Sequence, residues 1–344
     1  MDGPLFARLA QNTSDIVFKH FATKPENHVM IIYDTQCELS RNLKEAYEKA
    51  LHSHVKKSFV DFDSHPVEEI EACAGSLHVN DVVILIQSLS FRVSVYRWRL
   101  ELFDKGLKVG EHVRLSQILA HEIPNYVSCL TYDYLHTQPL SQKLEKLLNE
   151  TSHIKVECQK GSVLEFTSRM EKPVINLGDF DTGKVKGGYF PVGEIFSEAK
   201  DIEQVNGRVE VFAFPGEDHQ MVFTPKPFVV EIKNGYVEDG VFPEEFQPLV
   251  QMMRTENPDG KIPVREFGLG LNRGLSKEKR LTEATAWERV AGLHLSLGWK
   301  HGAYLKKFKA QKELNQRYHV DIYPDVKRMW ISDTLIYENG KFVI

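Results

Sequence analysis

The residues best suited to chemistry include an imidazole and a carboxylate two positions apart near the C-terminus. His319 and Asp321 lie in Tyr-His-Val-Asp-Ile, which has the composition of a β-strand. Because side chains on a strand alternate between its two faces, both groups project to the same side. Three further groups of the metal-binding type precede them in strand-like or turn-like segments, namely Glu194, Glu266 and His294. Together these residues could hold one or two divalent ions.

This mixture of carboxylate and imidazole groups suits zinc, manganese, cobalt or ferrous iron better than calcium. The set is larger than one catalytic ion with an open position normally takes, so it favours two ions that share a carboxylate. Such a pair polarises a carbonyl group and activates a bridging water. A carboxylate that is not bound to metal could act as general base. These are the ingredients of amide hydrolysis.

Each group also has a structural explanation that involves no metal. His294 lies in an apolar segment and could be a hydrogen-bonded core histidine. Glu194 follows a glycine and could end a turn, and Glu266 follows an arginine and could be half of an ion pair. Polar alternation such as that of His319 and Asp321 also occurs on hydrated edge strands. The residue types and spacing therefore leave both explanations open.

Composition limits the class of protein. The chain has 344 residues, enough for two domains that each bury a core. Its formal net charge of −5 argues against a constitutive nucleic-acid surface. The four cysteines are widely scattered, and neither a signal peptide nor an apolar run long enough to span a membrane is evident. We therefore expect a cytoplasmic protein that acts on a peptide or small molecule, without nucleic-acid or membrane partners.

Hydrophobic patterns divide the chain into two predicted domains, 1–151 and 152–344. In the first, strand and helix patterns alternate, which indicates a parallel sheet in an α/β domain. The clearest buried strand is Asp-Val-Val-Ile-Leu-Ile at 81–86. Three arginines in or beside the helix that follows it, Arg92, Arg97 and Arg99, could reach a substrate carboxylate, although surface ion pairs are the more common role. No Gly-rich nucleotide fingerprint follows any strand.

The second domain has a different pattern, with alternating strands and turn signals. A hairpin is predicted at 154–167 and another at 335–344, where Asn-Gly favours the primed turn that matches strand twist. Only 245–254 and 282–290 have helical spacing. The second domain is therefore expected to be mostly antiparallel β structure, and it contains all the candidate metal ligands.

Four segments of this domain resemble those of the thermophilic-type metalloaminopeptidases, the aminopeptidase T and aminopeptidase S group. Pro-Val-Gly-Glu-Ile-Phe (191–196) and Glu-Phe-Gly-Leu-Gly-Leu-Asn (266–272) are similar to the two segments that supply the family's glutamates. His-Leu-Ser-Leu-Gly (294–298) and His-Val-Asp (319–321) resemble its histidine strand and its final His-x-Asp pair. The motifs occur in family order and cover residues 170–344, and the first half of the chain matches more loosely.

The resemblance implies an α/β domain beside a β-barrel-like metal domain, usually in a homodimer with an enclosed site. It implies a leucyl-aminopeptidase-like hydrolase that cleaves the N-terminal residue of small peptides with two divalent ions, zinc, cobalt or manganese. Glu266 and Asp321 are then expected to be shared ligands. His294, His319 and Glu194 complete the metal shells, and Glu194 is also a candidate catalytic group.

One family feature is displaced in this chain. A family tyrosine that is thought to assist the tetrahedral intermediate follows the histidine of the Leu-Gly strand by seven residues. His301 occupies that position here, and the nearest tyrosine is Tyr304. Both residues are therefore candidates for the catalytic role. The chain is also shorter than the best-known aminopeptidases of the group.

Two alternatives remain beside the aminopeptidase. The fold family includes a mononuclear, non-haem iron, ring-cleaving dioxygenase that lacks the first glutamate and has a histidine in place of the second. This chain keeps Glu194 and Glu266, which favours the hydrolase, but two histidines and one carboxylate could hold a single Fe(II). The other alternative is a non-catalytic dimeric binding protein on the same fold.

Overall fold

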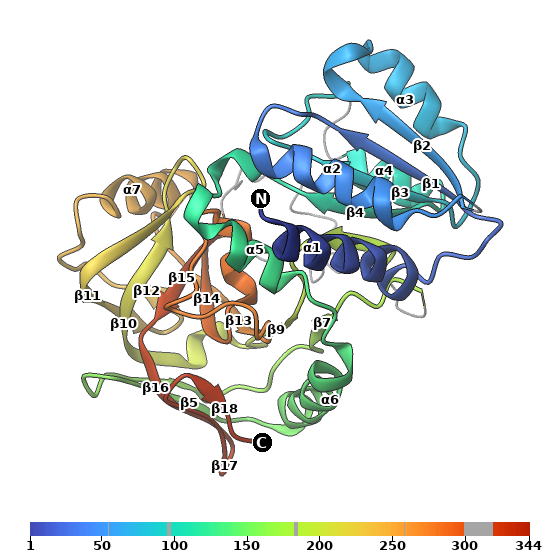
Figure 1. The fold of residues 1–344 in the computed structure, drawn as a ribbon. Helices are drawn as coiled ribbons and strands as arrows, with labels where there is room; N and C mark the ends of the chain where they lie inside the picture. The colour runs from blue at the N-terminus through green and yellow to red at the C-terminus, as the bar shows by residue number, and fades with distance from the viewer. Residues whose placement is uncertain (54, 95–97, 182–184, 258, 299–318) are drawn as a thin grey trace. The chain divides into compact units, whose positions relative to one another are not determined.

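The computed structural model of the chain describes residues 1–344 apart from 54, 95–97, 182–184, 258 and 299–318. The chain forms two compact units (Figure 1). Unit 1 comprises 1–134, 176–192 and 277–286, and unit 2 comprises 135–175, 193–276 and 287–344. Unit 1 thus includes two segments that follow residue 152, because 187–189 extends its sheet and 277–286 packs on it through side-chain hydrogen bonds.

Unit 1 is built on a five-stranded parallel sheet with the order β2-β1-β3-β4-β8. Its strands are β1 (His28–Tyr33), β2 (Lys56–Asp61), β3 (Val82–Ile86), β4 (Lys108–His112) and β8 (Gly187–Tyr189). Every residue of the central strand β3 is buried. Such a continuous apolar run is typical of a parallel strand that is covered on both faces.

Helices cover both faces of this sheet. They are α1 (Gly3–Asp15), α2 (Glu38–Ala50), α3 (Val67–Gly75), α4 (Trp98–Asp104) and α5 (Ile123–Cys129), with short helical turns at Ile16–His20, Phe62–Ser64, Leu115–Gln117 and Ala120–Glu122. Ile70 of α3 and Leu102 of α4 pack with Val83 and Val109 on one face. On the opposite face, Tyr47 of α2 hydrogen-bonds His112 of β4. The unit is therefore a three-layer α/β structure.

Two buried histidines should make unit 1 sensitive to acid. Burial lowers the pKa of His112 to about 3 and that of His20 to about 4. An unfolded histidine takes up its proton near pH 6.5, so below that pH the unfolded chain binds protons that the folded unit excludes. The free energy of unfolding should therefore fall by about 1.4 kcal/mol per pH unit for each histidine as the pH drops from 6.5 toward 4. Urea denaturation at several pH values measures this slope.

Substitution tests the assignment of that slope. His112→Gln keeps a polar group between the hydroxyls of Tyr47 and Tyr126, which lie 2.8 Å and 2.7 Å from the ring nitrogens. The variant should lose part of the pH dependence, whereas His65→Gln, at an exposed position, should keep all of it. An unchanged slope in His112→Gln would contradict the prediction.

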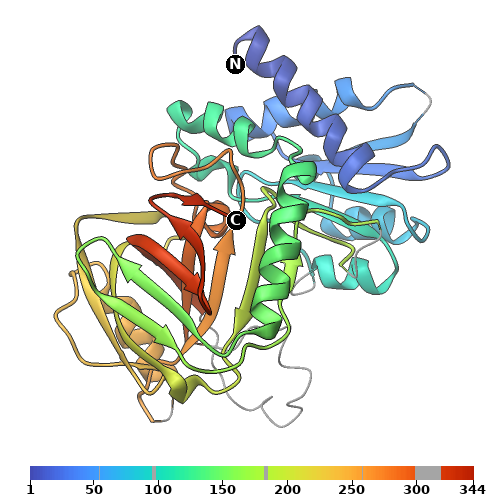
Figure 2. The same cartoon turned by 90° about the horizontal axis from the view of Figure 1, so that it is seen from below.

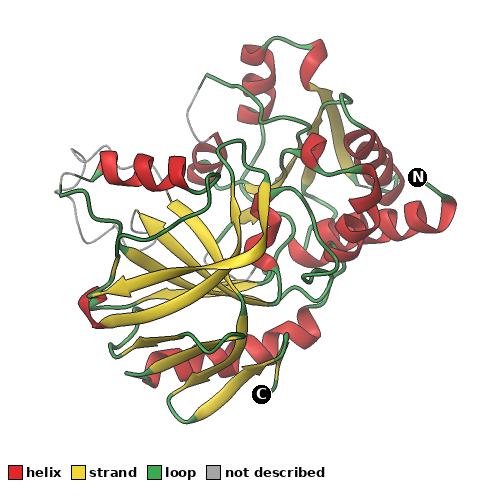
Figure 3. Cartoon of the chain, turned by 90° about the vertical axis from the view of Figure 1, so that its left-hand side faces the viewer, coloured by secondary structure: helices red, strands yellow, loops and turns green. Residues whose placement is uncertain are grey.

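Unit 2 contains a large antiparallel sheet of 13 strands, which curls strongly (Figure 3). The order along its main path is β18-β17-β16-β5-β6-β10-β15-β14-β13-β9-β7, and β11 and β12 extend from β10. The strands are β5 (Ile154–Cys158), β6 (Val163–Phe166), β7 (Val174–Asn176), β9 (Glu194–Glu198), β10 (Val205–Pro215), β11 (Met221–Lys233), β12 (Tyr236–Val237), β13 (Val264–Gly270), β14 (Gly292–Gly298), β15 (His319–Pro324), β16 (Val326–Ile331), β17 (Thr334–Glu338) and β18 (Lys341–Phe342).

Few helices accompany this sheet. They are α6 (Tyr134–Glu150), α7 (Gln247–Glu256), and short 3-10 segments at Ile202–Gln204 and Ala284–Arg289. The hairpin of β5 and β6 pairs with β16, and the C-terminal hairpin of β17 and β18 continues the same sheet (Figure 2). Among the residues that the structure describes, no helix is long and apolar enough to cross a membrane.

The predicted fold class is confirmed, an α/β part with a parallel sheet and a mostly antiparallel β part. The predicted strand at 81–86 and both predicted hairpins are present. The helix predicted at 282–290 is a 3-10 segment, and its last residue, Arg289, forms an ion pair with Glu194, one of the predicted metal ligands.

Candidate metal centre

The five predicted metal-binding residues lie on four strands that are neighbours in the sheet of unit 2. The order is β9, β13, β14 and β15, so that residues far apart in the sequence become adjacent. The residues are Glu194 at the start of β9, Glu266 on β13, His294 on β14, and His319 and Asp321 on β15. The antiparallel pairing of these strands therefore assembles the site.

The register of the strands places these side chains on one face. Residues opposite each other on antiparallel strands share a face, and His294 is opposite Gly268. Glu266 lies two positions before Gly268 on the same strand. A Cβ atom on Gly268 would lie 2.0 Å from Nε2 of His294. Glycine at 268 therefore provides the space that the imidazole occupies.

Three of the five residues form a compact buried cluster. One ligand atom each of Glu194, Glu266 and His294 lies within 4.8 Å of the others. Nε2 of His294 is 3.3 Å from Oε1 of Glu194 and 3.1 Å from Oε1 of Glu266. All three residues are at most 3% exposed, so the charges interact in a medium of low polarity.

The other two residues join this cluster through Glu266. Nε2 of His319 lies 3.9 Å from Oε2 of Glu266 and 3.2 Å from Oδ1 of Asp321. Ser296 hydrogen-bonds both members of the pair, at 2.8 Å to His319 and 2.5 Å to Asp321. The His319 side chain is 31% exposed, whereas that of Asp321 is 10% exposed. His319 is therefore the most accessible of the five predicted ligands.

A buried arginine borders the cluster on the side of Glu194. Nη1 of Arg289 forms an ion pair with Oε2 of Glu194 and lies 2.8 Å from Oε2 of Glu288. Arg289 is only 4% exposed. The site thus contains a permanent positive charge that belongs to the protein, because a guanidinium does not lose its proton at any ordinary pH.

Backbone contacts at the end of β13 position both Arg289 and Glu194. The carbonyl of Arg289 accepts a hydrogen bond from the amide of Asn272 at 2.9 Å, and Leu271 donates to the carbonyl of Gly193 at 2.8 Å. Gly193 has a φ of +117°, which favours glycine, and it packs against Asn272. The backbone at Arg289 and the backbone just before Glu194 are therefore both hydrogen-bonded to residues 271–272.

The electrostatics of the protein groups favour protonated imidazoles. Burial lowers the pKa of His294, but the hydrogen bonds and charges of Glu194 and Glu266 outweigh it and raise that pKa well above its ordinary value. Burial also lowers the pKa of His319, yet Asp321 and Glu266 raise it to about 10. Each imidazole then carries a positive charge among carboxylates, and a divalent cation would bind in exchange for protons.

The residues fit a divalent cation. Oε2 of Glu266 is buried and has no hydrogen-bond partner among the described residues, which is uncommon for a carboxylate oxygen. Two imidazoles and three carboxylates on one face are the donors that zinc, manganese, cobalt and ferrous iron take. Asp321 has Ser296 and His319 as partners, and the two oxygens of Glu194 face Arg289 and His294, so among the three carboxylates it is Glu266 that keeps a buried oxygen without a hydrogen bond.

Sequence reasoning brought together the five metal-binding candidates but missed their neighbours. The two other catalytic candidates, His301 and Tyr304, lie outside the described residues. Arg289 and Glu288 lie in the segment at 282–290 that was predicted to be helical, where nothing in the sequence sets them apart from other charged residues. Tyr323 could have been found, since it continues the alternation of His319 and Asp321 along β15, and its ring centre is 6.1 Å from that of His294.

Glu288 adds a carboxyl group that is an unusually weak acid, because its pKa is raised. Burial raises its pKa to about 8, while Arg289 acts in the opposite direction. A carboxyl group that titrates near neutral pH can both accept and release a proton during a reaction. The site therefore offers a candidate proton acceptor that is separate from the five predicted ligands.

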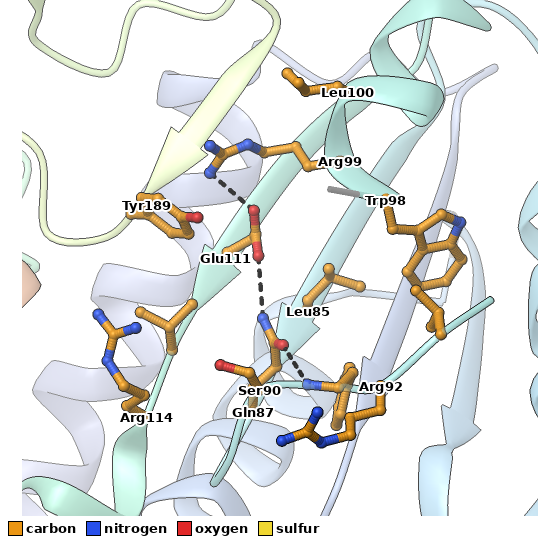
Figure 4. Close-up of a pocket in the computed structure, with 13 residues that line it drawn as sticks. Leu85, Gln87, Ser90, Arg92, Trp98, Arg99, Leu100, Glu111, Arg114 and Tyr189 are labelled. Atoms are coloured by element: carbon orange, nitrogen blue, oxygen red, sulfur yellow. Dashed lines mark hydrogen bonds and ion pairs between the residues drawn. The ribbon is translucent and has the colours of Figure 1, made fainter. Parts of the chain in front are cut away.

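A cavity of about 840 Å³ lies in unit 1 and is lined by residues of strands β3, β4 and β8 and of the segments that follow β3 and β4 (Figure 4). Glu111 in this cavity pairs with Arg99 at 2.8 Å and accepts a hydrogen bond from Gln87 at 3.1 Å. The guanidinium of Arg99 also stacks 4.0 Å from the ring centre of Tyr189. Arg99 therefore forms an ion pair, but with the buried Glu111 rather than on the surface as predicted; Arg92 lines the same cavity, and Arg97 lies outside the described residues.

Comparisons with known proteins identify the fold. No model of a protein family matches the sequence, and no curated protein matches it. The structure of 2,5-dihydroxypyridine dioxygenase from Pseudomonas putida KT2440 is similar, with a TM-score of 0.65 and 14% sequence identity over 98% of this chain and 97% of that chain. Wild-type AmpT (aminopeptidase T) from Thermus thermophilus is similar with a TM-score of 0.62 and 11% identity, over 98% of this chain and 99% of that chain.

At these identities the likeness shows a shared fold, over nearly the whole of both chains. Both similar proteins are enzymes. The chain therefore has the two-part fold of a group that includes an aminopeptidase and a dioxygenase, and it has a group of metal-type ligands in its β part.

Proposed function

We propose that the protein is a metal-dependent hydrolase that removes the N-terminal residue from small peptides. The observation that carries this proposal is the carboxylate-rich cluster in which Glu194 and Glu266 both contact His294. The resemblance of four sequence segments to metalloaminopeptidases and the fold shared with AmpT support it. Glu194, Glu266, His294, His319 and Asp321 are the proposed metal ligands.

A divalent ion bound by these residues would polarise a peptide carbonyl and make a bound water more acidic. The protein's own side chains orient the ligands and transfer the proton. Ser296 orients His319 and Asp321 through its hydrogen bonds, and Arg289 holds Glu194 in its ionised form. Glu288 could receive the proton that water loses and pass it to the departing amine, since its pKa of about 8 suits both steps.

A second candidate is a ring-cleaving dioxygenase that uses a single Fe(II). Its specific support is the shared fold with 2,5-dihydroxypyridine dioxygenase, together with two imidazoles and a carboxylate at His294, His319 and Asp321. The presence of Glu266 where that enzyme class has a histidine favours the hydrolase. Metal identity and oxygen consumption separate the two candidates.

The test begins with protein purified without chelator and loaded separately with zinc, cobalt, manganese and ferrous iron. Elemental analysis then gives the metal content, and a panel of aminoacyl substrates tests hydrolysis. Turnover with zinc, cobalt or manganese under argon supports the aminopeptidase. Oxygen uptake that requires ferrous iron would instead support the dioxygenase, and the absence of bound metal after every loading would contradict both.

His319→Ala should lower metal content and abolish turnover while the fold remains. His319 is at the accessible edge of the cluster, so its loss removes a donor without leaving a large buried cavity. Elemental analysis and circular dichroism measure the two effects, and His153→Ala, at a half-exposed position in the same unit, serves as control. Wild-type metal loading in His319→Ala would remove this residue from the ligand set.

A further inference from the structure

The buried guanidinium of Arg289 affects the number of ions that the site can hold, because it contacts carboxylates that a cation would also need. Its Nη1 contacts Glu194 and Glu288, two of the four carboxylates at the site. The resemblance makes Glu266 and Asp321 the shared ligands, so a second ion would depend on other carboxylates of the site, such as Glu194, for its remaining oxygen donors. Oε2 of Glu194 already faces Arg289, and only Oε1, which faces His294, remains for a metal.

Arg289 cannot easily move away. Its carbonyl is hydrogen-bonded to Asn272, and Gly270 allows the backbone of 289–290 to approach closely, because a Cβ there would lie 2.0 Å from the carbonyl oxygen of Val290. Withdrawal would leave the carboxylate of Glu194 buried without its arginine, which is strongly unfavourable. The guanidinium is therefore a fixed part of the site.

We propose that Arg289 takes the place of a second metal ion, so that the site holds one divalent ion per chain. The proposal rests on the metal-dependent function proposed above. The single ion is held by His294, Glu266, His319 and Asp321, with Oε1 of Glu194 as a further donor. This differs from the two ions that the sequence resemblance implies.

Electrostatic repulsion supports the same count. Two catalytic ions that share ligands lie about 3.5–4 Å apart. A second ion beside Glu194 would have to lie next to a guanidinium in a site where little water screens the repulsion. It would also compete with Arg289 for Oε2 of Glu194 and for Glu288, which is the other carboxylate that Arg289 contacts among the described residues.

The test is a count of ions in the wild type and in matched variants, by equilibrium dialysis against manganese or zinc followed by elemental analysis. Arg289→Met removes the charge but keeps an unbranched side chain of similar length, and Arg289→Lys keeps a cation. We expect one ion in the wild type and in Arg289→Lys, and two in Arg289→Met, where the second ion should bind about 100-fold more tightly than to the wild type.

A second substitution checks which groups hold the added ion. Glu288→Gln in the Arg289→Met background should return the count to one, because it removes the carboxylate that Arg289→Met releases. Circular dichroism establishes that each variant is folded, and Arg289→Gln, which also removes the charge but keeps a hydrogen-bond donor for Glu194, takes the place of Arg289→Met if that variant does not fold.

The outcomes separate the two proposals. Two ions in the wild type would overturn the role of Arg289 but leave the metal-dependent function intact. One ion in both the wild type and folded Arg289→Met would also overturn the inference, because the arginine would then not be what excludes the second ion. No ion under any loading would overturn the proposed function and the inference together.

Discussion

Glu266→Gln should abolish metal binding and turnover with little change in the fold. Glu266 is the only residue of the cluster that contacts both His294 and His319, through different carboxylate oxygens. It therefore connects the buried half of the site to the accessible half. Glutamine has the same shape, but it offers one neutral oxygen in place of two charged ones.

The expected size of this effect is large. Changing residues that only support a ligand typically costs 10- to 100-fold in metal affinity, so loss of the central ligand should cost more than about 100-fold. Isothermal titration with zinc or manganese measures the affinity, and hydrolysis of aminoacyl substrates measures turnover.

A matched substitution controls for the loss of a negative charge. Glu231→Gln changes an exposed glutamate on β11 of the same unit, where the carboxylate pairs with Arg208 on the surface. This variant should bind metal as the wild type does. Near-normal metal affinity in Glu266→Gln would show that the donors lie elsewhere, and the cluster would then be a structural ion-pair network.

Gly268→Ala should disable the site although residue 268 carries no functional group. A Cβ at this position would lie 2.0 Å from Nε2 and 2.3 Å from Cε1 of His294. The imidazole is buried and packs near Tyr323, so it cannot turn aside without disturbing its neighbours. We expect metal affinity to fall by about 10- to 100-fold and the free energy of unfolding to fall by about 1–3 kcal/mol.

A double-mutant cycle tests whether His294 transmits this effect. If alanine at 268 acts by displacing the imidazole, Gly268→Ala should have no further effect on metal affinity in a His294→Ala background. Gly240→Ala is the control, since an added Cβ there meets nothing closer than 3.4 Å. Additive losses in the cycle would mean that Gly268→Ala distorts the strand itself rather than the histidine.

Local pattern was enough to predict most of the fold. The strand at 28–33 and the strand at 81–86 are short apolar runs, and such runs have few alternatives between turn signals. The ligand segments could be predicted because period-two alternation places His319 and Asp321 on one face. Glycines beside Glu266 likewise indicate a close approach of another group.

The role of Arg289 could not be predicted in the same way. Its contact with Glu194 depends on bonds between the 284–289 segment and the end of β13, which are formed by backbone groups that any sequence possesses. The pattern at 282–290 indicates a helix, and an arginine on a helix is normally solvated. Only the tertiary structure shows that this one is buried among carboxylates.

Because the proposed ligands lie on separate neighbouring strands, metal binding would depend on which of these strands have already paired. In a chain in which β9 has paired with β13 but β15 has not yet joined β14, Glu194 and Glu266 are present without His319 and Asp321. Such an intermediate has carboxylate oxygens, which bind abundant magnesium and calcium weakly, but lacks half of its imidazole nitrogens. If the site binds a transition metal as proposed, selectivity for that metal would require the completed sheet, and metal content would then report correct assembly.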